Sequence, residues 1–390
     1  MSAPDPATAT RPAGASRTVL LVAGEASGDM HGADLVAALR ALVPGVRVRG
    51  VGGARLRAAG METLVDTTAI ATMGLLEARD RLGAVLRAYR LVRGLLRDEP
   101  PDLLILIDFP EFNLALAGVA RRRRVPVLCY ISPQVWAWRR GRIRKIARRV
   151  DRMAVVFPFE APLYAASGVR AEFVGHPLLD RVRATRSREE TLARHGLDPG
   201  KRLIALLPGS RVKEIRLILP VIAEAAARLV ARGDCQCVLA LAETLSAADV
   251  AASMRGRPLA ATVVPDDTYD LVHASALALV ASGTATLETA LLERPMVIVY
   301  RMSALTFALA RRLVSVPFIG MPNLIAGRGI VPELVQGDAT GARIAAEAER
   351  LLDDPAQHAA TVVALASLRS LLGGGGAARR AAAIAAEMLA

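Results

Sequence analysis

The sequence has 390 residues, too many for one hydrophobic core, which stops growing near about 250–300 residues, so we expect two domains. Hydrophobic residues make up 53% and charged residues 22%, which excludes a disordered chain. The net charge of +13 is local, because twelve basic residues and one acidic residue lie between Arg121 and Arg152, which indicates one anion-facing surface.

Residues 1–17 are rich in Ala, Pro, Ser and Thr and lack the apolar stretch of roughly 7–15 residues that a secretory signal requires, so we expect a disordered tail. No stretch of about 18 residues is free of charges and turn formers, which argues against a transmembrane helix. The three cysteines, Cys129, Cys235 and Cys237, match neither a disulfide framework nor a zinc site. These features favour a cytoplasmic protein.

From Thr18 onward, short β-branched runs alternate with longer helical stretches, which is typical of parallel α/β sheets. In the first half we predict a helix over about 30–42 and strands at 18–23, 46–51, 102–108, 125–131 and 152–157. This first half ends near residues 172–177. A charged linker over 179–201 follows, and the alternation restarts with strands at 202–207, 235–241, 261–265, 277–282 and 295–300. We therefore predict an α/β fold with two tandem Rossmann-like domains, 18–178 and 202–340, and C-terminal helices over 341–390.

Ligands of open α/β sheets bind beyond the carboxyl ends of the strands, so the turns that follow the strands are the candidate sites. The first turn, 24–29, matches neither a dinucleotide fingerprint nor a P-loop, and no acidic residue plainly takes the ribose position, which excludes a nicotinamide site. A tight turn with a capping residue explains it equally well. Asp108 ends the apolar run LLILI, and a half-buried carboxylate there suits a general base, although a helix cap or a loop hydrogen bond also explains it.

Two turns of the second half suggest a nucleoside diphosphate site. After the strand at 202–207 come Ser210 and Arg211, where helix N–H groups and a guanidinium can bind phosphates, unless Ser210 and Glu214 only cap the helix. At the end of the strand at 277–282 lie Ser282, Gly283 and Thr284, whose hydroxyls and backbone N–H groups can bind phosphate. Glu288 lies one helical turn further on, and its carboxylate can accept hydrogen bonds from a ribose. A buried capping network is the alternative there.

The basic stretch has helical periodicity. From Arg139, apolar residues fall on one arc, at Ile143, Ile146, Ala147 and Val150, and basic residues on the other, at Arg144, Lys145, Arg148, Arg149 and Arg152. With Trp136 and Trp138 just before it, the stretch fits contact with an anionic lipid surface. A core helix with a solvated face fits as well. Nucleic acid is less favoured, because aromatic residues make up only 4% and no recognised binding motif occurs.

Taken together, these segments resemble the bacterial lipid-A-disaccharide synthases, glycosyltransferases of the GT-B architecture. The resemblance covers most of the chain, because nine blocks occur in the family's order: VAGEASGD (22–29), MGLLE (73–77), IDFPEFN (107–113), SPQVWAW (132–138), FVGHP (173–177), LLPGSR (206–211), SGTATLE (282–288), YRM (300–302) and PNLIAGR (322–328). The sequence departs from the commoner family residues at Ala26 and Glu111, and both changes keep size class or charge.

The resemblance implies an inverting transfer from UDP-2,3-diacylglucosamine to 2,3-diacylglucosamine 1-phosphate, which gives a β-1,6-linked disaccharide and UDP at the cytoplasmic face of the inner membrane. It implies Asp108 as the base for the acceptor hydroxyl and Arg211 as the group that neutralises the departing diphosphate. Ser210, Ser282, Gly283 and Thr284 would hold the diphosphate, Glu288 the ribose, and Asn323 would line the donor pocket. Glu25, Ser27 and Met73 would lie near the sugars. No metal or cofactor is implied, which agrees with the missing Asp-x-Asp motif.

The sequence is also compatible with two other functions and with a dimeric assembly. Another GT-B UDP-sugar transferase or a UDP-sugar epimerase is the nearest alternative enzyme, and it would not need the basic surface with its tryptophans. A polyanion-binding module is the alternative from another class, and it predicts salt-sensitive binding of nucleic acid without binding of UDP. The alanine-rich C-terminal helices would allow a homodimer.

Overall fold

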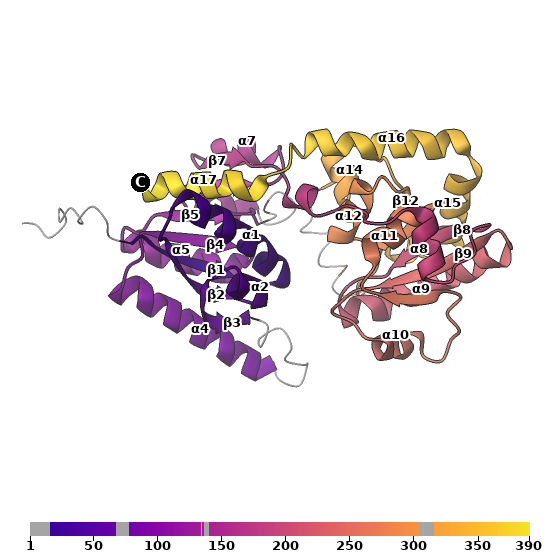
Figure 1. Ribbon diagram of the computed structural model, residues 1–390, viewed down its shortest axis with the longest axis horizontal. Coiled ribbons are helices and arrows are strands. Elements are labelled where there is room, and N and C mark those ends of the chain that lie inside the picture. The colour runs from indigo at the N-terminus through magenta and orange to yellow at the C-terminus, as the bar shows by residue number, and fades with distance from the viewer. Residues whose placement is uncertain (1–15, 68–77, 134, 136–139, 304–306, 308–315) are drawn as a thin grey trace, which may run out of the picture. The chain divides into compact units, whose positions relative to one another are not determined.

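A computed structural model describes residues 16–67, 78–133, 135, 140–303, 307 and 316–390 (Figure 1). The chain divides into two compact units. Of the described residues, unit 1 takes those up to 135, those from 140 to 177 and 375–390, and unit 2 takes those from 178 to 374.

Unit 1 is built on a seven-stranded parallel sheet in the order β3-β2-β1-β4-β5-β6-β7. Its strands are β1 (Thr18–Ala23), β2 (Arg47–Gly52), β3 (Glu62–Asp66), β4 (Leu103–Ile107), β5 (Val127–Tyr130), β6 (Arg152–Val155) and β7 (Arg170–Phe173). Strands β4 and β5 are buried along their whole length, which explains their continuous apolar sequences. The strand order reverses between β1 and β4, and this reversal point is where such sheets bind ligands.

The helices of unit 1 are α1 (Ala26–Leu42), α2 (Ala54–Ala58), α4 (Ala78–Asp98), α5 (Pro110–Arg122), α6 (Ile143–Ala147), α7 (Glu160–Ala165) and α17 (Ala377–Leu389), with a 3-10 turn η3 at Arg140–Arg142. Helix α1 begins at Ala26, earlier than the sequence predicts, so the turn 24–29 includes its first turn. Asp29 belongs to that turn, and its carboxylate accepts the backbone N–H groups of Gly53, Arg55 and Leu56 at the start of α2.

Unit 2 is built on a six-stranded parallel sheet in the order β10-β9-β8-β11-β12-β13. Its strands are β8 (Arg202–Leu207), β9 (Cys235–Leu241), β10 (Thr262–Pro265), β11 (Leu277–Ala281), β12 (Met296–Tyr300) and β13 (Glu333–Val335). Its helices are α8 (Arg188–Arg194), α9 (Val212–Ala231), α10 (Ala247–Met254), α11 (Thr268–Ala274), α12 (Thr284–Leu291), α14 (Met321–Ala326), α15 (Gly341–Asp353) and α16 (Pro355–Leu371), with 3-10 turns η4 (Pro177–Asp180) and η5 (Gln336–Asp338). The order again reverses between neighbouring strands, here β8 and β11.

The C-terminal helix α17 packs against α1 of unit 1, whereas α15 and α16 belong to unit 2 (Figure 1). Arg152 on β6 fixes this position, because its buried guanidinium donates to Glu172 of β7 and, at 2.7 Å, to Glu387 of α17. The Arg380 side chain of α17 donates to the Val174 carbonyl at 2.9 Å.

The predicted fold class, two parallel Rossmann-like sheets followed by C-terminal helices, is confirmed. The edge strands β3 and β13 have no counterpart in the prediction, because their sequences, ETLVD and ELV, contain charged residues and no continuous apolar run. The segment 179–201, expected to be a linker, contains α8 and clusters with unit 2. A capping box between Ser187 and Glu190 starts α8, and this signal is local to the sequence.

Candidate functional site

Asp108 follows β4 at the reversal point of the unit 1 sheet, and it meets the first turn of α1 there. The Ser27 hydroxyl donates a hydrogen bond of 2.8 Å to Asp108 Oδ2, so the two predicted residues lie together. Glu25 is the exposed N-cap residue of α1, next to this pair in the chain. Gly24 lets the two segments approach closely, because a Cβ atom there would lie 2.3 Å from the Phe109 ring.

The backbone at this point is strained. Asp108 has φ of 40°, and Ile131, which directly follows the adjacent strand β5, has φ of 63°. Positive φ is uncommon outside glycine, and for a β-branched residue such as isoleucine it is an outlier. Residues held in such conformations cluster at functional sites, where the surrounding structure maintains the strain. Two of them at the ends of adjacent strands therefore support a site at Asp108.

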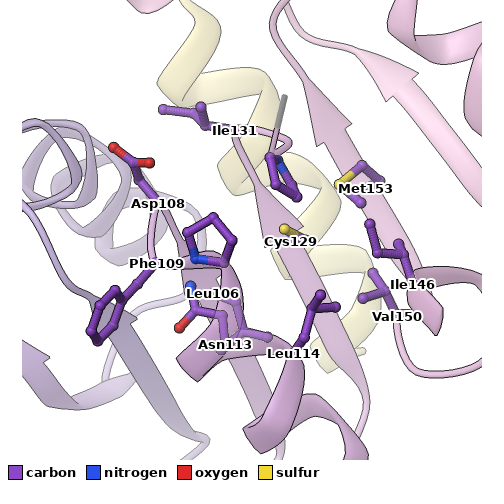
Figure 2. A pocket seen from close by; sticks show the side chains of 12 residues that line it. Leu106, Asp108, Phe109, Asn113, Leu114, Cys129, Ile131, Ile146, Val150 and Met153 are labelled. Carbon is purple, nitrogen blue, oxygen red and sulfur yellow. The ribbon is translucent and has the colours of Figure 1, made fainter. Parts of the chain in front are cut away.

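A pocket with an almost entirely apolar lining adjoins Asp108 (Figure 2). The lining side chains fill most of it, so the free space is close to that of one water molecule. The lining residues are Leu106, Asp108, Phe109, Pro110, Asn113, Leu114, Cys129, Ile131, Pro133, Ile146, Val150 and Met153. Figure 2 shows the Asp108 carboxylate at one end, Cys129 in the middle, and Ile146, Val150 and Met153 on the opposite side.

Two polar groups of the lining are held inside unit 1. Burial raises the pKa of the Cys129 thiol to about 12, so it stays protonated and unreactive at neutral pH. Asn113 on α5 donates from Nδ2 to the Ile107 carbonyl at 3.2 Å, and its buried Oδ1 has no hydrogen-bond partner in the described part of the chain. Sequence analysis did not single out Asn113, although it ends the block IDFPEFN.

The prediction of a long amphipathic helix from Arg139 onward is corrected by the structure. The helix is one short turn, α6, and its apolar side chains face the protein interior. Ile143, Ile146 and Val150 are buried in the core of unit 1, so they are not available to a lipid surface. Two of the five basic residues predicted on the solvent face are engaged within unit 1. Arg149 donates to the Leu114 carbonyl at 2.8 Å, and Arg152 is the buried partner of Glu172 and Glu387.

The remaining predicted cations, Arg144, Lys145 and Arg148, are exposed. Lys145 also lines an open hollow with Gly141, Arg142 and Glu111, in which Arg142 and Glu111 form an ion pair. Trp136, Trp138 and Met73, which the resemblance also implicates, lie outside the described residues.

In unit 2, the turn after β8 places the predicted phosphate-binding groups around a carboxylate of the chain itself. Glu214, in the first turn of α9, accepts the Ser210 backbone N–H at 3.1 Å and the Arg211 guanidinium at 3.0 Å. The Arg211 side chain is otherwise largely exposed, at 69%. A carboxylate of the chain thus holds the two donors expected to meet a diphosphate, which agrees with the alternative that Ser210 and Glu214 cap the start of α9.

The turn after β11 brings together Ser282, Gly283 and Thr284 at the start of α12. Gly283 is the N-cap residue, and both it and Thr284 are exposed, so the N-terminus of α12 is open to a ligand. The Ser282 hydroxyl donates to the Ile319 carbonyl at 3.0 Å, so in this structure its proton is used within the protein and its oxygen is the group left to accept.

Glu288 lies one turn deeper on α12 and is half-buried. Burial raises the pKa of its carboxyl group, and a hydrogen bond of 2.8 Å from the Tyr269 hydroxyl on α11 acts in the opposite direction. The sequence around Tyr269 gives no signal for this contact, because α11 and α12 are separate helices that meet only when the chain folds.

Asn323 on α14 is buried, and its amide is fully used. Nδ2 donates to the Val331 carbonyl and, at 2.7 Å, to Glu333, while Oδ1 accepts the backbone N–H groups of Ile330 and Val331. Glu333 also accepts the backbone N–H groups of Ile319 and Gly320, at 2.9 and 3.0 Å. The pair therefore organises the loop whose Ile319 carbonyl receives the Ser282 hydroxyl. Glu333 was missed because it belongs to a three-residue strand without a sequence signal.

Among the described residues, no group of three or more His, Cys, Asp or Glu side chains is placed to hold a metal ion. None of the helices described has the length and apolarity required to cross a membrane.

Comparison with known proteins places the chain in one family. The family model for lipid-A-disaccharide synthetase matches residues 19–387. The lipid-A-disaccharide synthase of Geobacter sulfurreducens is 50% identical over 375 residues, which cover 96% of this chain and 98% of that protein. The synthase of Syntrophus aciditrophicus is 46% identical over 361 residues, covering 92% of this chain and 94% of the relative.

Solved structures with the same architecture are much more distant in sequence. The calicheamicin glycosyltransferase CalG4 gives a TM-score of 0.60 at 18% identity, over 96% of this chain and 98% of that one. The UDP-GlcNAc 2-epimerase of Neisseria meningitidis, solved with UDP-GlcNAc bound, gives 0.58 at 12% identity, over 95% and 99% of the two chains. These likenesses show the shared two-sheet fold.

Proposed function

The chain belongs to the lipid-A-disaccharide synthase family of glycosyltransferases, and we propose that it transfers the sugar of UDP-2,3-diacylglucosamine to 2,3-diacylglucosamine 1-phosphate. The products are UDP and a β-1,6-linked disaccharide phosphate. The family match supports the reaction, and the strained Asp108 held by Ser27 at the reversal point of the sheet is the observation that carries its mechanism.

The proposed reaction inverts the anomeric centre, which requires a base on the acceptor and stabilisation of the leaving group. Asp108 accepts the proton of the acceptor 6-hydroxyl as its oxygen attacks the anomeric carbon of the donor. Ser27 donates to one carboxylate oxygen, which orients the group and leaves the other oxygen to take the proton. The bond between the anomeric carbon and the diphosphate oxygen breaks, and UDP leaves with its negative charge.

Unit 2 supplies the groups for UDP in this proposal. Arg211 and the Ser210 N–H exchange Glu214 for the diphosphate and stabilise the charge that develops on it. Ser282, Gly283 and Thr284 present the open N-terminus of α12 to the phosphates. Glu288 accepts hydrogen bonds from the ribose hydroxyls. Asn323 acts through Glu333 on the loop at Ile319, because a direct contact with the donor would require it to give up an existing hydrogen bond.

We further propose peripheral contact with the anionic cytoplasmic face of the inner membrane, where diacylated substrates reside. The support is the exposed cluster of Arg144, Lys145 and Arg148, together with the hollow at Lys145. The apolar contribution predicted from the helix is absent, because Ile143, Ile146 and Val150 are buried.

The test is to incubate the purified protein with both substrates in detergent micelles. Mass spectrometry identifies the tetra-acyl disaccharide phosphate and UDP, and proton NMR reads the anomeric coupling of the new linkage. A β-linked product is expected. An α-linked product would refute inversion, and UDP-sugar epimerisation without a disaccharide would refute the transfer.

A further inference from the structure

A side-chain hydrogen bond joins the turn after β8 to the turn after β9. The Thr244 hydroxyl donates to the Ser210 carbonyl at 2.5 Å. We propose, on the basis of the proposed function, that Thr244 is a positioning residue, which orients the peptide between Ser210 and Arg211 toward the diphosphate of UDP. In this proposal Thr244 acts through these two residues and does not itself contact the nucleotide.

The hydrogen bond from Thr244 acts on the peptide unit that links the two proposed diphosphate ligands. The Ser210 carbonyl and the Arg211 backbone N–H belong to the same planar group, and in a trans peptide these two bonds point in opposite directions. A donor that fixes the carbonyl therefore also fixes the direction of the N–H. Arg211 is the N-cap residue of α9 and has an extended backbone, so the orientation of this peptide sets how its N–H and its side chain leave the start of the helix.

The contacts that hold this turn differ in what happens to them when a diphosphate binds. Glu214 accepts the Ser210 N–H at 3.1 Å and the Arg211 guanidinium at 3.0 Å. In the proposed function the diphosphate takes both of these donors. The Ser210 carbonyl is an acceptor and therefore no ligand for an anion, so its hydrogen bond from Thr244 is compatible with bound UDP. Thr244 thus keeps the turn in place after Glu214 is displaced.

The turn after β8 requires a contact of this kind, because packing does not fix it. Ser210 and Arg211 are both exposed. The preceding residue, Gly209, has φ of 122°, which belongs to the region that glycine enters without steric cost. Glycine has more backbone freedom than any other residue, so the position of the next peptide depends on the hydrogen bonds that it makes.

Thr244 is itself held by the residues around it. Strands β8 and β9 are parallel neighbours, so the turns that follow them lie at the same edge of the sheet. The Leu245 backbone N–H donates to the Ala242 carbonyl at 2.9 Å, which closes a tight turn that includes Thr244. Directly after it, Ser246 and Asp249 form the capping box that starts α10. Thr244 therefore connects the turn after β8 to a segment with a defined backbone.

The proposal is tested with Thr244→Val, which has nearly the shape of threonine but lacks the hydroxyl group. Thr244→Ser keeps the hydroxyl and serves as the conservative rescue. Thr262→Val makes the same exchange at an exposed position of the edge strand β10 and is the matched control. Calorimetry measures the affinity for UDP, and NMR titration measures the affinity for uridine, which carries no phosphate. Thermal unfolding establishes that each variant is folded.

We expect Thr244→Val to weaken UDP binding by roughly three- to tenfold, which is the effect of losing one hydrogen bond. Uridine binding stays at the wild-type value, because uridine has no group that meets this turn. Thr244→Ser and Thr262→Val keep the wild-type affinity for both ligands. A wild-type UDP affinity in Thr244→Val would overturn the proposal. Equal weakening for UDP and uridine would also overturn it, since Thr244 would then support unit 2 in general.

The failure of this proposal can be distinguished from failure of the proposed function. If the wild type binds UDP but forms no disaccharide, the proposed function is wrong, and the two affinities still decide the role of Thr244. If the wild type is active and Thr244→Val binds UDP as the wild type does, only the positioning role is wrong. A wild type that binds no UDP would refute both.

Discussion

The residues to which we assign the chemistry lie at or shortly after the carboxyl ends of strands, and each contacts one neighbour. Asp108 is held by Ser27, Glu288 by Tyr269, and Arg211 by Glu214. In each pair the partner comes from a segment far away in the sequence or from the next helical turn. These partners are the most direct targets for mutation. Replacing one of them changes the position of the carboxylate or guanidinium that it holds without removing that group.

Tyr269→Phe tests the role of Glu288. The Tyr269 hydroxyl holds the Glu288 carboxylate in position, so loss of this hydrogen bond is expected to weaken UDP binding because Glu288 is no longer oriented toward the ribose. The loss should disappear with 2′,3′-dideoxy-UDP, which has no ribose hydroxyls for Glu288 to bind. Calorimetry measures both affinities. Equal weakening for the two nucleotides would show that Tyr269 acts on the general structure of unit 2 and not through the ribose.

His176 in the block FVGHP is predicted to make stability depend on pH. Burial and the nearby His31 lower its pKa from 6.5 to about 3, so between these values the unfolded chain binds a proton that the folded chain does not. Stability therefore falls as the pH is lowered from 6.5 toward 3, with a slope of up to about 1.4 kcal/mol per pH unit from this group. Urea unfolding at several pH values should show a shallower slope in His176→Gln. An identical slope would exclude His176 as its source.

At the scale of elements, residues 319–331, which precede β13, are organised by the Asn323–Glu333 pair. Asn323→Ala leaves two backbone N–H groups and part of the Glu333 carboxylate without partners, and each unsatisfied buried group costs about 1–3 kcal/mol. We expect a loss of about 3–5 kcal/mol in urea unfolding. A large rise in KM for the UDP-sugar without loss of stability would instead establish direct contact with the donor.

The elements also show how far sequence reasoning reaches. The apolar runs of β4, β8 and β11 predict strands because both faces of a parallel sheet are buried, and the ends of these strands gave Asp108, Arg211 and Ser282 as candidates. Helical spacing correctly separated Ile143 and Ile146 from Arg144 and Lys145, but it could not tell that the apolar arc meets the core. Tyr269, Glu333 and Asn113 lacked a signal, because their roles arise from contacts that only the fold creates.

At the scale of the whole molecule, the positive charge concentrates in unit 1, where the exposed cations Arg144, Lys145 and Arg148 follow η3. Replacing all three with alanine should weaken binding to anionic vesicles by about 3 kcal/mol, since each basic residue near such a surface contributes about 1 kcal/mol. Vesicle sedimentation measures the effect, which should shrink as salt is added. Arg87, Arg90 and Arg93 of α4 are also exposed, lie outside the basic stretch 121–152, and offer a control of equal charge change. Equal losses from both triple variants would show that net charge, not this surface, governs binding.

The kinetics of Asp108→Asn decide whether Asp108 is the base of an inverting lipid-A-disaccharide synthase reaction. Asparagine keeps the shape and can still accept the Ser27 hydrogen bond, but it cannot take a proton. Removal of a general base is expected to lower kcat by about 10²–10⁴, while UDP affinity stays at the wild-type value and the exposed control Asp98→Asn keeps full activity. A wild-type kcat in Asp108→Asn would exclude Asp108 as the base.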